Sequence, residues 1–333
     1  MDNRPESRDP EFLLEVSDLV QRFAQPRGIL DRLAGKPQKV VHAVNGVSFA
    51  VRRGEVFSLV GESGCGKSTT ARTIVRLLEP KSGSIVFDGE DISKFSASEM
   101  MPVRKKMQMI FQDPYASLNP RQRIKDIIME PMLFHGIASG KDEAHEKMFR
   151  LLDIVGFRPE QADRYPHQFS GGQRQRIGIA RALSTNPAFI VADEPVSALD
   201  VSIQAQVLNL MMDLRDEFTL SYLFIAHDLS VVRHVTERVG IMYLGFIVEQ
   251  GDCDAIFGNP MHPYTKALLA AAPTLDRIVA AEPLKGDVPS PITLPPGCPF
   301  ANRCPQRRDL CTTTRPQLRE HSGRIVACHF SGN

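Results

Sequence analysis

The sequence predicts an α/β protein whose core is a parallel β-sheet with crossover helices. Two apolar segments, AFIVADEP and SYLFIAHD, have the composition of buried strands, and each ends in polar residues. A helical pattern over 201–215 lies between them, and strand, helix and strand in this order are typical of a parallel sheet. A third apolar segment, VFSLV, leads into the glycine-rich stretch GESGCGKST (61–69). Polar residues at the ends of such strands face the crevice where α/β sheets bind ligands.

The N-terminal part of the chain contributes further strands and a helix. Short apolar runs alternate with polar breaks in LLEVSDLV, KVVHAV, VSFAV and VFSLV, which predicts strands, with RRGE (52–55) as a turn. A helix is predicted over 68–79, because its apolar residues recur at helical spacing. The segment SGSIVFDGEDI (82–92) is typical of a hairpin.

The middle of the chain is predicted to be mostly helical. Residues 94–168 are polar and rich in Met, and residues 142–155 give their clearest helical pattern. An amphipathic helix follows FSGGQRQR and runs to Leu183. The segment IMYLGFIVEQGD (241–252) predicts a second hairpin, with Gly245 near its turn.

Composition narrows the classes of function. The chain has 333 residues, 42% of them hydrophobic, and its 40 Lys and Arg nearly balance its 39 Asp and Glu. A net charge of +1 gives no indication of a nucleic-acid partner. The polar start MDNRPESRDPE is unlike a secretory signal, and the apolar stretch 239–248 is too short to span a bilayer. We therefore expect a soluble protein, or one held at a membrane by its partners.

The stretch GESGCGKST fits the phosphate-loop pattern G-x-x-x-x-G-K-[ST], between a strand and a helix. Its glycines let backbone N–H groups point at phosphates, Lys67 neutralises the β- and γ-phosphates, and Ser68 can bind Mg²⁺. The alternative is a glycine-rich turn before a helix. The residues expected to bind nucleotide here are Gly61, Ser63, Gly64, Cys65, Gly66, Lys67, Ser68 and Thr69.

Four polar residues at strand ends are the candidates for hydrolysis. Asp193 can hold Mg²⁺, and Glu194 beside it can orient or deprotonate the attacking water. Gln112, after the apolar run ending in IF, could bind Mg²⁺ or the water, and His227 could hydrogen-bond the γ-phosphate. The alternatives are an acidic helix cap for the two acids and ordinary turn residues for Gln112 and His227.

The stretch FSGGQ (169–173) predicts a second anion site. Ser170 can cap the following helix, and Gly171 and Gly172 let a phosphate approach its positive end. Since the loop at 61–69 already surrounds phosphates, this helix end is expected to face outward. It would then complete the nucleotide site of a second, similar chain.

GESGCGKST, Gln112, FSGGQ, ADEP, SALD and His227, in this order, resemble the motifs of the ATPase subunit of an ABC transporter, over residues 12–260. The family signature usually reads LSGGQ and begins here with Phe169. The resemblance implies two ATPase subunits with two ATP between them, each bound by one chain's phosphate loop and the other chain's signature. It implies Mg²⁺ at Ser68, Gln112 and Asp193, and an adenine stacked on Phe23. The residues that would face the partner's ATP are Ser170, Gly171, Gly172, Gln173 and Asp200.

The same resemblance implies a P-loop NTPase core of ABC ATPase type over 12–258. It would carry an antiparallel β subdomain, an α-helical subdomain at about 113–172, and a small loop-rich C-terminal appendage containing Cys. The segment NPMHPYTKALLAAAP (259–273) resembles the oligopeptide/dipeptide importer group and opens an extension over 259–333. The implied work is uptake of peptides, or in relatives nickel or oligosaccharides. Its partners would be two membrane-spanning permease subunits and, indirectly, an extracytoplasmic binding protein, at the cytoplasmic face of the membrane.

Four of the six Cys cluster in the extension, which is also rich in Pro, with the spacing C-x5-C-x6-C-x16-C. Two are followed by Pro, as happens at iron–sulfur ligands, while the paired C-x2-C knuckles of zinc ribbons are absent. Some members of the importer group carry a [4Fe–4S] cluster here, and zinc and free or oxidised thiols are the alternatives. Cys65 and Cys253 are not expected to be ligands. The predicted ligands are Cys298, Cys304, Cys311 and Cys328.

Two other classes of function are open at this point. One is an ABC protein of translation or DNA repair, which usually has two cassettes in one chain or a long coiled-coil insertion, and this sequence shows neither. The other is a redox or metal-sensing module, in which the Cys-rich part is the working site and ATP a regulator.

Overall fold

A computed structural model describes residues 11–28, 35, 37–271 and 286–331. The polar start, over residues 1–10, lies outside them. The chain forms two compact units. The first unit comprises Met1–Ala50, Phe57–Lys94 and His227–Asn333, and the second comprises Val51–Val56 and Phe95–Ala226. No helix among the described residues is long and apolar enough to cross a membrane.

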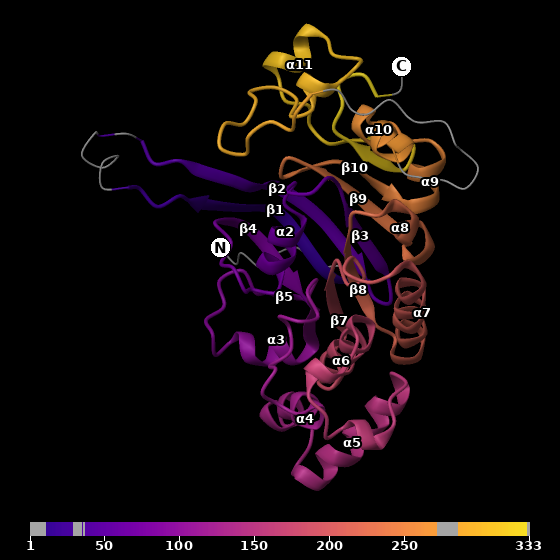
Figure 1. The fold of residues 1–333 in the computed structure, drawn as a ribbon. Helices are drawn as coiled ribbons and strands as arrows, with labels where there is room; N and C mark the ends of the chain where they lie inside the picture. The colour runs from indigo at the N-terminus through magenta and orange to yellow at the C-terminus, as the bar shows by residue number, and fades with distance from the viewer. Residues whose placement is uncertain (1–10, 29–34, 36, 272–285, 332–333) are drawn as a thin grey trace. The chain divides into compact units, whose positions relative to one another are not determined.

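A four-stranded sheet in the first unit has the order β2-β1-β4-β5 (Figure 1). Strand β1 (Phe12–Ala24) pairs antiparallel with β4 (Ser82–Phe87), and β4 with β5 (Glu90–Asp91), which confirms the hairpin predicted at 82–92. The runs KVVHAV and VSFAV form one strand, β2 (Val40–Arg52), rather than two. Gly46 lies between them at φ 74°, and glycine tolerates this conformation without ending the strand.

A second sheet joins the C-terminal segment to the core of the first unit. Its strands follow the order β11-β12-β10-β9-β3. The hairpin predicted at 241–252 is confirmed, with Leu244 at φ 47° and Gly245 at φ 80° in its turn. Because β12 pairs with β10, the Cys-rich extension contributes strands to this sheet. The bounds are β3 Val56–Val60, β9 Arg238–Tyr243, β10 Phe246–Asp252, β11 Arg319–His321 and β12 Arg324–Val326.

The helix after the glycine-rich loop, α2 (Lys67–Ile74), is shorter than the predicted 68–79. Arg76 has φ 56°, outside the right-handed helical region, and the chain reaches Pro80 soon afterwards. The prediction was too long because the helical spacing of apolar residues continues past the turn at which the helix ends. The other helices among the described residues of this unit are α8 Leu229–Val235, α9 Cys253–Gly258, α10 Pro263–Ala271, η3 Ala301–Arg303 and α11 Asp309–Thr313.

The second unit contains two of the predicted parallel strands, β7 (Phe189–Asp193) and β8 (Ser221–Ala226), and a further strand, β6 (Met107–Ile110), inside the region 94–168 that was predicted to be mostly helical. Strands β8, β7 and β6 lie in that order, and both neighbouring pairs are parallel. Helix α7 (Val201–Phe218) connects β7 to β8, as the pattern over 201–215 predicts. The residues of β7 and β8 are all buried, which explains their continuous apolar sequence.

Three helices of the second unit pack on one another (Figure 1): α4 (Ile124–Phe134), α5 (Lys141–Ile154) and α6 (Gly171–Leu183). Helix α5 corresponds to the pattern predicted at 142–155, and its buried residues are Ala144, Met148 and Leu152. Its inner face is therefore the apolar stripe that the sequence indicates. Shorter helical segments are α3 Met100–Lys106, η1 Pro159–Gln161 and η2 Pro166–Gln168.

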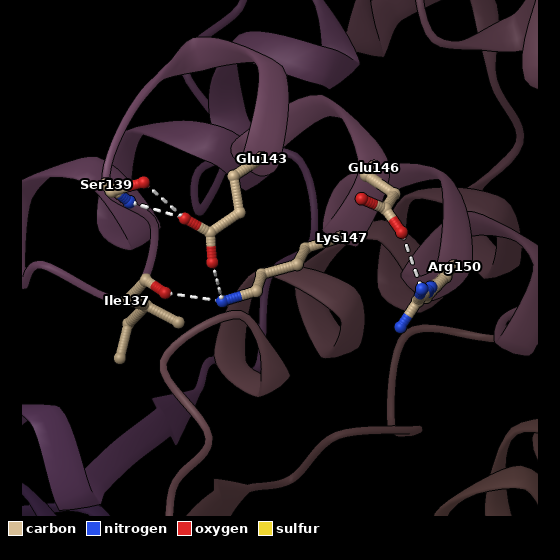
Figure 2. Close-up of polar contacts among 6 residues, drawn as sticks. All are labelled: Ile137, Ser139, Glu143, Glu146, Lys147 and Arg150. Carbon is tan, nitrogen blue, oxygen red and sulfur yellow. Dashed lines mark hydrogen bonds and ion pairs between the residues drawn. The ribbon is translucent and has the colours of Figure 1, made fainter.

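The outer face of α5 carries two ion pairs, shown in Figure 2. Glu143 accepts hydrogen bonds from the backbone N–H and hydroxyl of Ser139 and lies 2.7 Å from the Lys147 ammonium. The hydrogen bond from Lys147, and then those from Ser139, lower the pKa of Glu143 to about 2. Glu146 and Arg150 form the second pair, at 2.6 Å. Exposed pairs of this kind contribute little to stability, so these residues provide controls for the variants below.

Candidate functional site

The phosphate loop lies between β3 and α2. Lys67 is buried, and its ammonium donates hydrogen bonds to the carbonyls of Gly61 (2.7 Å) and Glu62 (3.1 Å). Its Nζ also lies 3.8 Å from the Cys65 sulfur, and the backbone N–H of Gly245 donates to the Cys65 carbonyl. The Lys67 ammonium thus lies within the curved backbone of the loop at the start of a helix, which is the arrangement that binds phosphates.

Gly66 shows why this loop requires glycine. Its φ is 109°, and a Cβ atom there would collide with the carbonyl oxygen of Ala43. Any other residue would have to move the backbone of β2. Cys65 is buried, so a small side chain fits there, whereas Ser63 and Gly64 are exposed on the outer part of the loop.

Three predicted hydrolytic residues belong to the second unit, and two of them touch. Asp193 ends β7 and is fully buried. Glu194 follows at φ 47°, and its backbone N–H donates to the carbonyl of Ile225. The side-chain amide of Gln112 donates to the Glu194 carboxylate at 2.8 Å, although 82 residues separate them. A left-handed conformation in a residue with a side chain costs about 1–3 kcal/mol and occurs preferentially at functional sites.

The signature helix α6 begins with a reciprocal capping box. Ser170 accepts a hydrogen bond from the Gln173 backbone N–H at 3.3 Å, and the Gln173 side chain accepts one from the Ser170 N–H at 3.0 Å. The cap predicted at Ser170 is therefore present. A Cβ on Gly172 would collide with Ile203 of α7, and Phe169 packs edge-on against Phe157.

The other predicted site residues lie at exposed or half-exposed positions. His227 follows β8 directly and is exposed. Asp200 precedes α7 and is exposed, and its side chain makes no capping hydrogen bond. Phe23 lies near the end of β1 with 39% of its surface exposed, so it is not an ordinary core residue.

The four clustered cysteines of the extension line one pocket of the first unit. All six cysteines of the chain are free, so no disulfide joins the four clustered cysteines. Burial raises the pKa of Cys298 to about 11 and also raises those of Cys304 and Cys328, so these thiols are protonated at neutral pH. The cysteines lining the pocket are Cys298, Cys304, Cys311 and Cys328, with His262 and His329 beside them.

The pocket does not have the geometry of a single-ion site. Among the described residues, no group of three or more His, Cys, Asp or Glu side chains is arranged to hold a metal ion. This arrangement therefore supports neither zinc nor the predicted iron–sulfur cluster. The metal site predicted from the spacing is likewise not confirmed. The structure places four cysteines, none of them in a disulfide, around one pocket.

No pattern in the sequence predicts the contacts made by Glu62. Its backbone N–H donates to the Tyr264 hydroxyl, and its carboxylate pairs with Arg303. The partners are 202 and 241 residues away along the chain. The one related signal is the segment NPMHPYTK, which resembles a known motif and contains Tyr264 but assigns this residue no role.

Two family models match the chain. The model described as "ABC transporter" matches residues 44–197, and the model described as "Oligopeptide/dipeptide transporter, C-terminal region" matches residues 248–311. The first match contains the phosphate loop, Gln112, FSGGQ and ADEP. The second contains the His-Pro-Tyr segment and the cluster cysteines up to Cys311.

Similar proteins match along almost the whole chain. The oligopeptide transport ATP-binding protein AppF of Bacillus subtilis (strain 168) is 51% identical, over 96% of this chain and 98% of AppF. The dipeptide transport ATP-binding protein DppF of Escherichia coli (strain K12) is 48% identical, over 95% of this chain and 93% of DppF.

Among solved structures, the chain is similar to the ATP-binding cassette MJ0796 in a dimeric post-hydrolysis state bound to ADP and Pi. That structure is 26% identical, covers 72% of this chain and 98% of its own, and has a TM-score of 0.63. A second similar structure is cbiO1 from Clostridium perfringens, part of the ABC transporter complex cbiONQ. It is 26% identical with a TM-score of 0.62, over 75% of this chain and 92% of its own.

Proposed function

This chain belongs to the ABC transporter family as an ATP-hydrolysing subunit, and we propose that it energises the uptake of di- and oligopeptides. The observation that carries the proposal is the 51% identity to an oligopeptide transport ATP-binding protein over 96% of the chain. The C-terminal region supports the same class, because its matching model describes oligopeptide and dipeptide transporters. The translation or DNA-repair class lacks comparable support.

We assign the roles within the ATPase cycle as follows. The N–H groups of the phosphate loop and Lys67 would bind the ATP phosphates, and Ser68, Gln112 and Asp193 would hold Mg²⁺, which neutralises charge on the transferred phosphoryl group. Glu194 would orient the attacking water and take its proton. The hydrogen bond from Gln112 supports this role, because it fixes one carboxylate oxygen.

The remaining site residues would complete the chemistry. His227 would hydrogen-bond the γ-phosphate, and Phe23 would stack on adenine, which its half-exposed position allows. The α6 terminus and Asp200 would face ATP held by a second ATPase subunit, identical or similar. Two permease subunits and an extracytoplasmic binding protein would complete the importer, with this chain at the cytoplasmic face of the membrane.

Peptide uptake provides the test of the proposed substrate. Deleting the gene is expected to abolish uptake of radiolabelled di- and tripeptides by whole cells, and re-expressing the wild-type chain to restore it. A chain carrying Glu146→Gln is the matched control and should also restore uptake, because it loses only one exposed ion pair (Figure 2). Unchanged peptide uptake together with lost nickel or oligosaccharide uptake would contradict the peptide assignment.

We further propose that the four-Cys pocket binds a [4Fe–4S] cluster in a structural role. The proposal is supported by the four cysteines that line one pocket and by the Pro that follows two of them, as happens at iron–sulfur ligands. Because burial raises the pKa values of Cys298, Cys304 and Cys328, cluster binding must release protons from these thiols. None of the four cysteines is among the proposed hydrolytic groups, so the cluster would not act as a catalytic group.

Anaerobic purification is expected to yield brown protein with about four iron atoms per chain. Cys304→Ser should bleach the colour and make the extension more sensitive to protease, because a bound cluster would cross-link the loops that carry the four cysteines. The control is Cys253→Ser, in a buried cysteine outside the pocket, which should keep the colour. One zinc and no iron in anaerobic preparations would contradict the cluster.

A further inference from the structure

Glu62 follows Gly61 in the phosphate loop and is held from several sides. Its backbone N–H donates to the Tyr264 hydroxyl at 2.9 Å. Its carbonyl accepts hydrogen bonds from the Lys67 ammonium at 3.1 Å and from the Cys65 N–H at 3.2 Å. The path of the loop around Lys67 therefore depends on where Glu62 is fixed.

The carboxylate of Glu62 is bound by an arginine of the C-terminal extension. Arg303 Nη1 lies 2.7 Å from one carboxylate oxygen, and Nη2 lies 3.0 Å from the other, which is a bidentate pair. The side chain of Arg303 is only 7% exposed and that of Glu62 25% exposed, so solvent screens this pair less than a surface pair. Arg303 also lies within 3.4 Å of the Tyr243 hydroxyl.

An aromatic cluster fixes the two groups that contact Glu62. The ring of Phe300 lies 5.4 Å from Tyr264 and 5.3 Å from Tyr243, and Phe300 is fully buried. Phe300 also accepts the backbone hydrogen bond of Arg303. Rings packed in this way hold the Tyr264 hydroxyl and the Arg303 guanidinium in one place.

The charge of Glu62 gives Arg303 a second effect. A carboxylate in a loop that binds phosphates repels the anionic ligand, and the repulsion grows as solvent is excluded. A bidentate guanidinium neutralises that carboxylate. Without Arg303, the loop would carry an uncompensated negative charge five residues before Lys67.

We infer that Arg303 and Tyr264 are positioning residues for ATP binding, through which the C-terminal extension holds and neutralises Glu62 in the phosphate loop. This inference rests on the proposed ATPase function of the loop. It assigns the extension a part in nucleotide affinity, in addition to the cluster proposed for its cysteines. Neither residue touches the reacting atoms, so their loss should raise the KM for ATP and leave kcat at saturating ATP largely unchanged.

The test measures MgATP binding and steady-state hydrolysis by the full chain. Arg303→Met is expected to weaken ATP binding about tenfold, as the loss of one charge-assisted bidentate contact would. Adding Glu62→Gln to that variant should recover most of the lost ATP affinity, because it removes the carboxylate that Arg303 no longer neutralises. Arg303→Lys should fall between wild type and Arg303→Met, since it keeps the charge and loses the bidentate geometry.

The matched control is Arg315→Met. Arg315 also lies in the extension, donates to the carbonyls of Pro295 and Gly297, and stacks over the ring of Phe246. Its loss perturbs the same region without touching the phosphate loop, so ATP affinity should stay at the wild-type value. Tyr264→Phe keeps the ring packing and removes only the hydroxyl, and about threefold weaker binding is expected from it.

Wild-type ATP affinity in both Arg303→Met and Tyr264→Phe would overturn the inference. Failure of Glu62→Gln to recover binding in the Arg303→Met background would also overturn it, because the loss would then not pass through Glu62. If Arg303→Met does not fold, as judged by thermal melting, Tyr264→Phe decides the question alone. A wild-type chain that fails to bind ATP would instead contradict the proposed function, and the two failures are thus distinguishable.

Discussion

Glu194→Gln is expected to bind MgATP with wild-type affinity and to hydrolyse it about 10² to 10⁴ times more slowly. Glutamine keeps the size of the side chain and can still accept a hydrogen bond from Gln112, but it cannot take a proton from water. The ATP-bound dimer should therefore accumulate. Equilibrium nucleotide binding, phosphate release and size-exclusion chromatography with ATP measure the three consequences.

The control for this variant is Glu146→Gln, which removes a carboxylate from the exposed face of α5 in the same unit. Its hydrolysis rate should equal that of the wild type. The assignment of Glu194 is wrong if Glu194→Gln hydrolyses ATP at the wild-type rate. Equal losses of affinity and rate would also contradict it, since they would point to a damaged site rather than a missing base.

The features that the sequence predicts well are those whose signal is local. The strand VFSLV coincides with β3, both hairpins are present, and the capping box at Ser170 forms as its residue types indicate. Periodicity, turn residues and caps act over a few residues, so a single sequence contains them. The contact between Gln112 and Glu194 follows from a simple rule, since both come after neighbouring parallel strands.

The features that escape the sequence depend on contacts between distant segments. Helix α2 ends before its apolar spacing does, because Arg76 takes a left-handed conformation. The apolar pattern of β2 contains a break that the strand itself does not have. The Glu62–Arg303 pair spans 241 residues, and no pattern in either segment identifies the other. The four cysteines are brought to one pocket as their clustering indicates, while their spacing alone does not fix what they bind.

The second large effect is expected from the two predicted anion sites. Lys67→Ala should weaken ATP binding on the order of 100-fold, because it removes the only cation seen inside the described phosphate loop. Ser170→Arg should leave the ATP affinity of the isolated chain unchanged and abolish hydrolysis. It places bulk at the α6 terminus, where the partner's phosphates would approach, and it breaks the capping box, which costs about 1 kcal/mol of stability.

Mixing the two variants distinguishes sites completed by the partner chain from sites completed within one chain. In a dimer of one Lys67→Ala chain and one Ser170→Arg chain, one composite site combines an intact phosphate loop with an intact signature, and the other carries both defects. Hydrolysis absent from either variant alone should thus return in the mixture, at no more than half the wild-type sites. If each site were completed within its own chain, both chains would stay defective and the mixture would be inactive. Loss of ATP affinity in the isolated Ser170→Arg chain, equal to that of Lys67→Ala, would contradict the shared-site arrangement directly, because the signature would then contact its own chain's nucleotide.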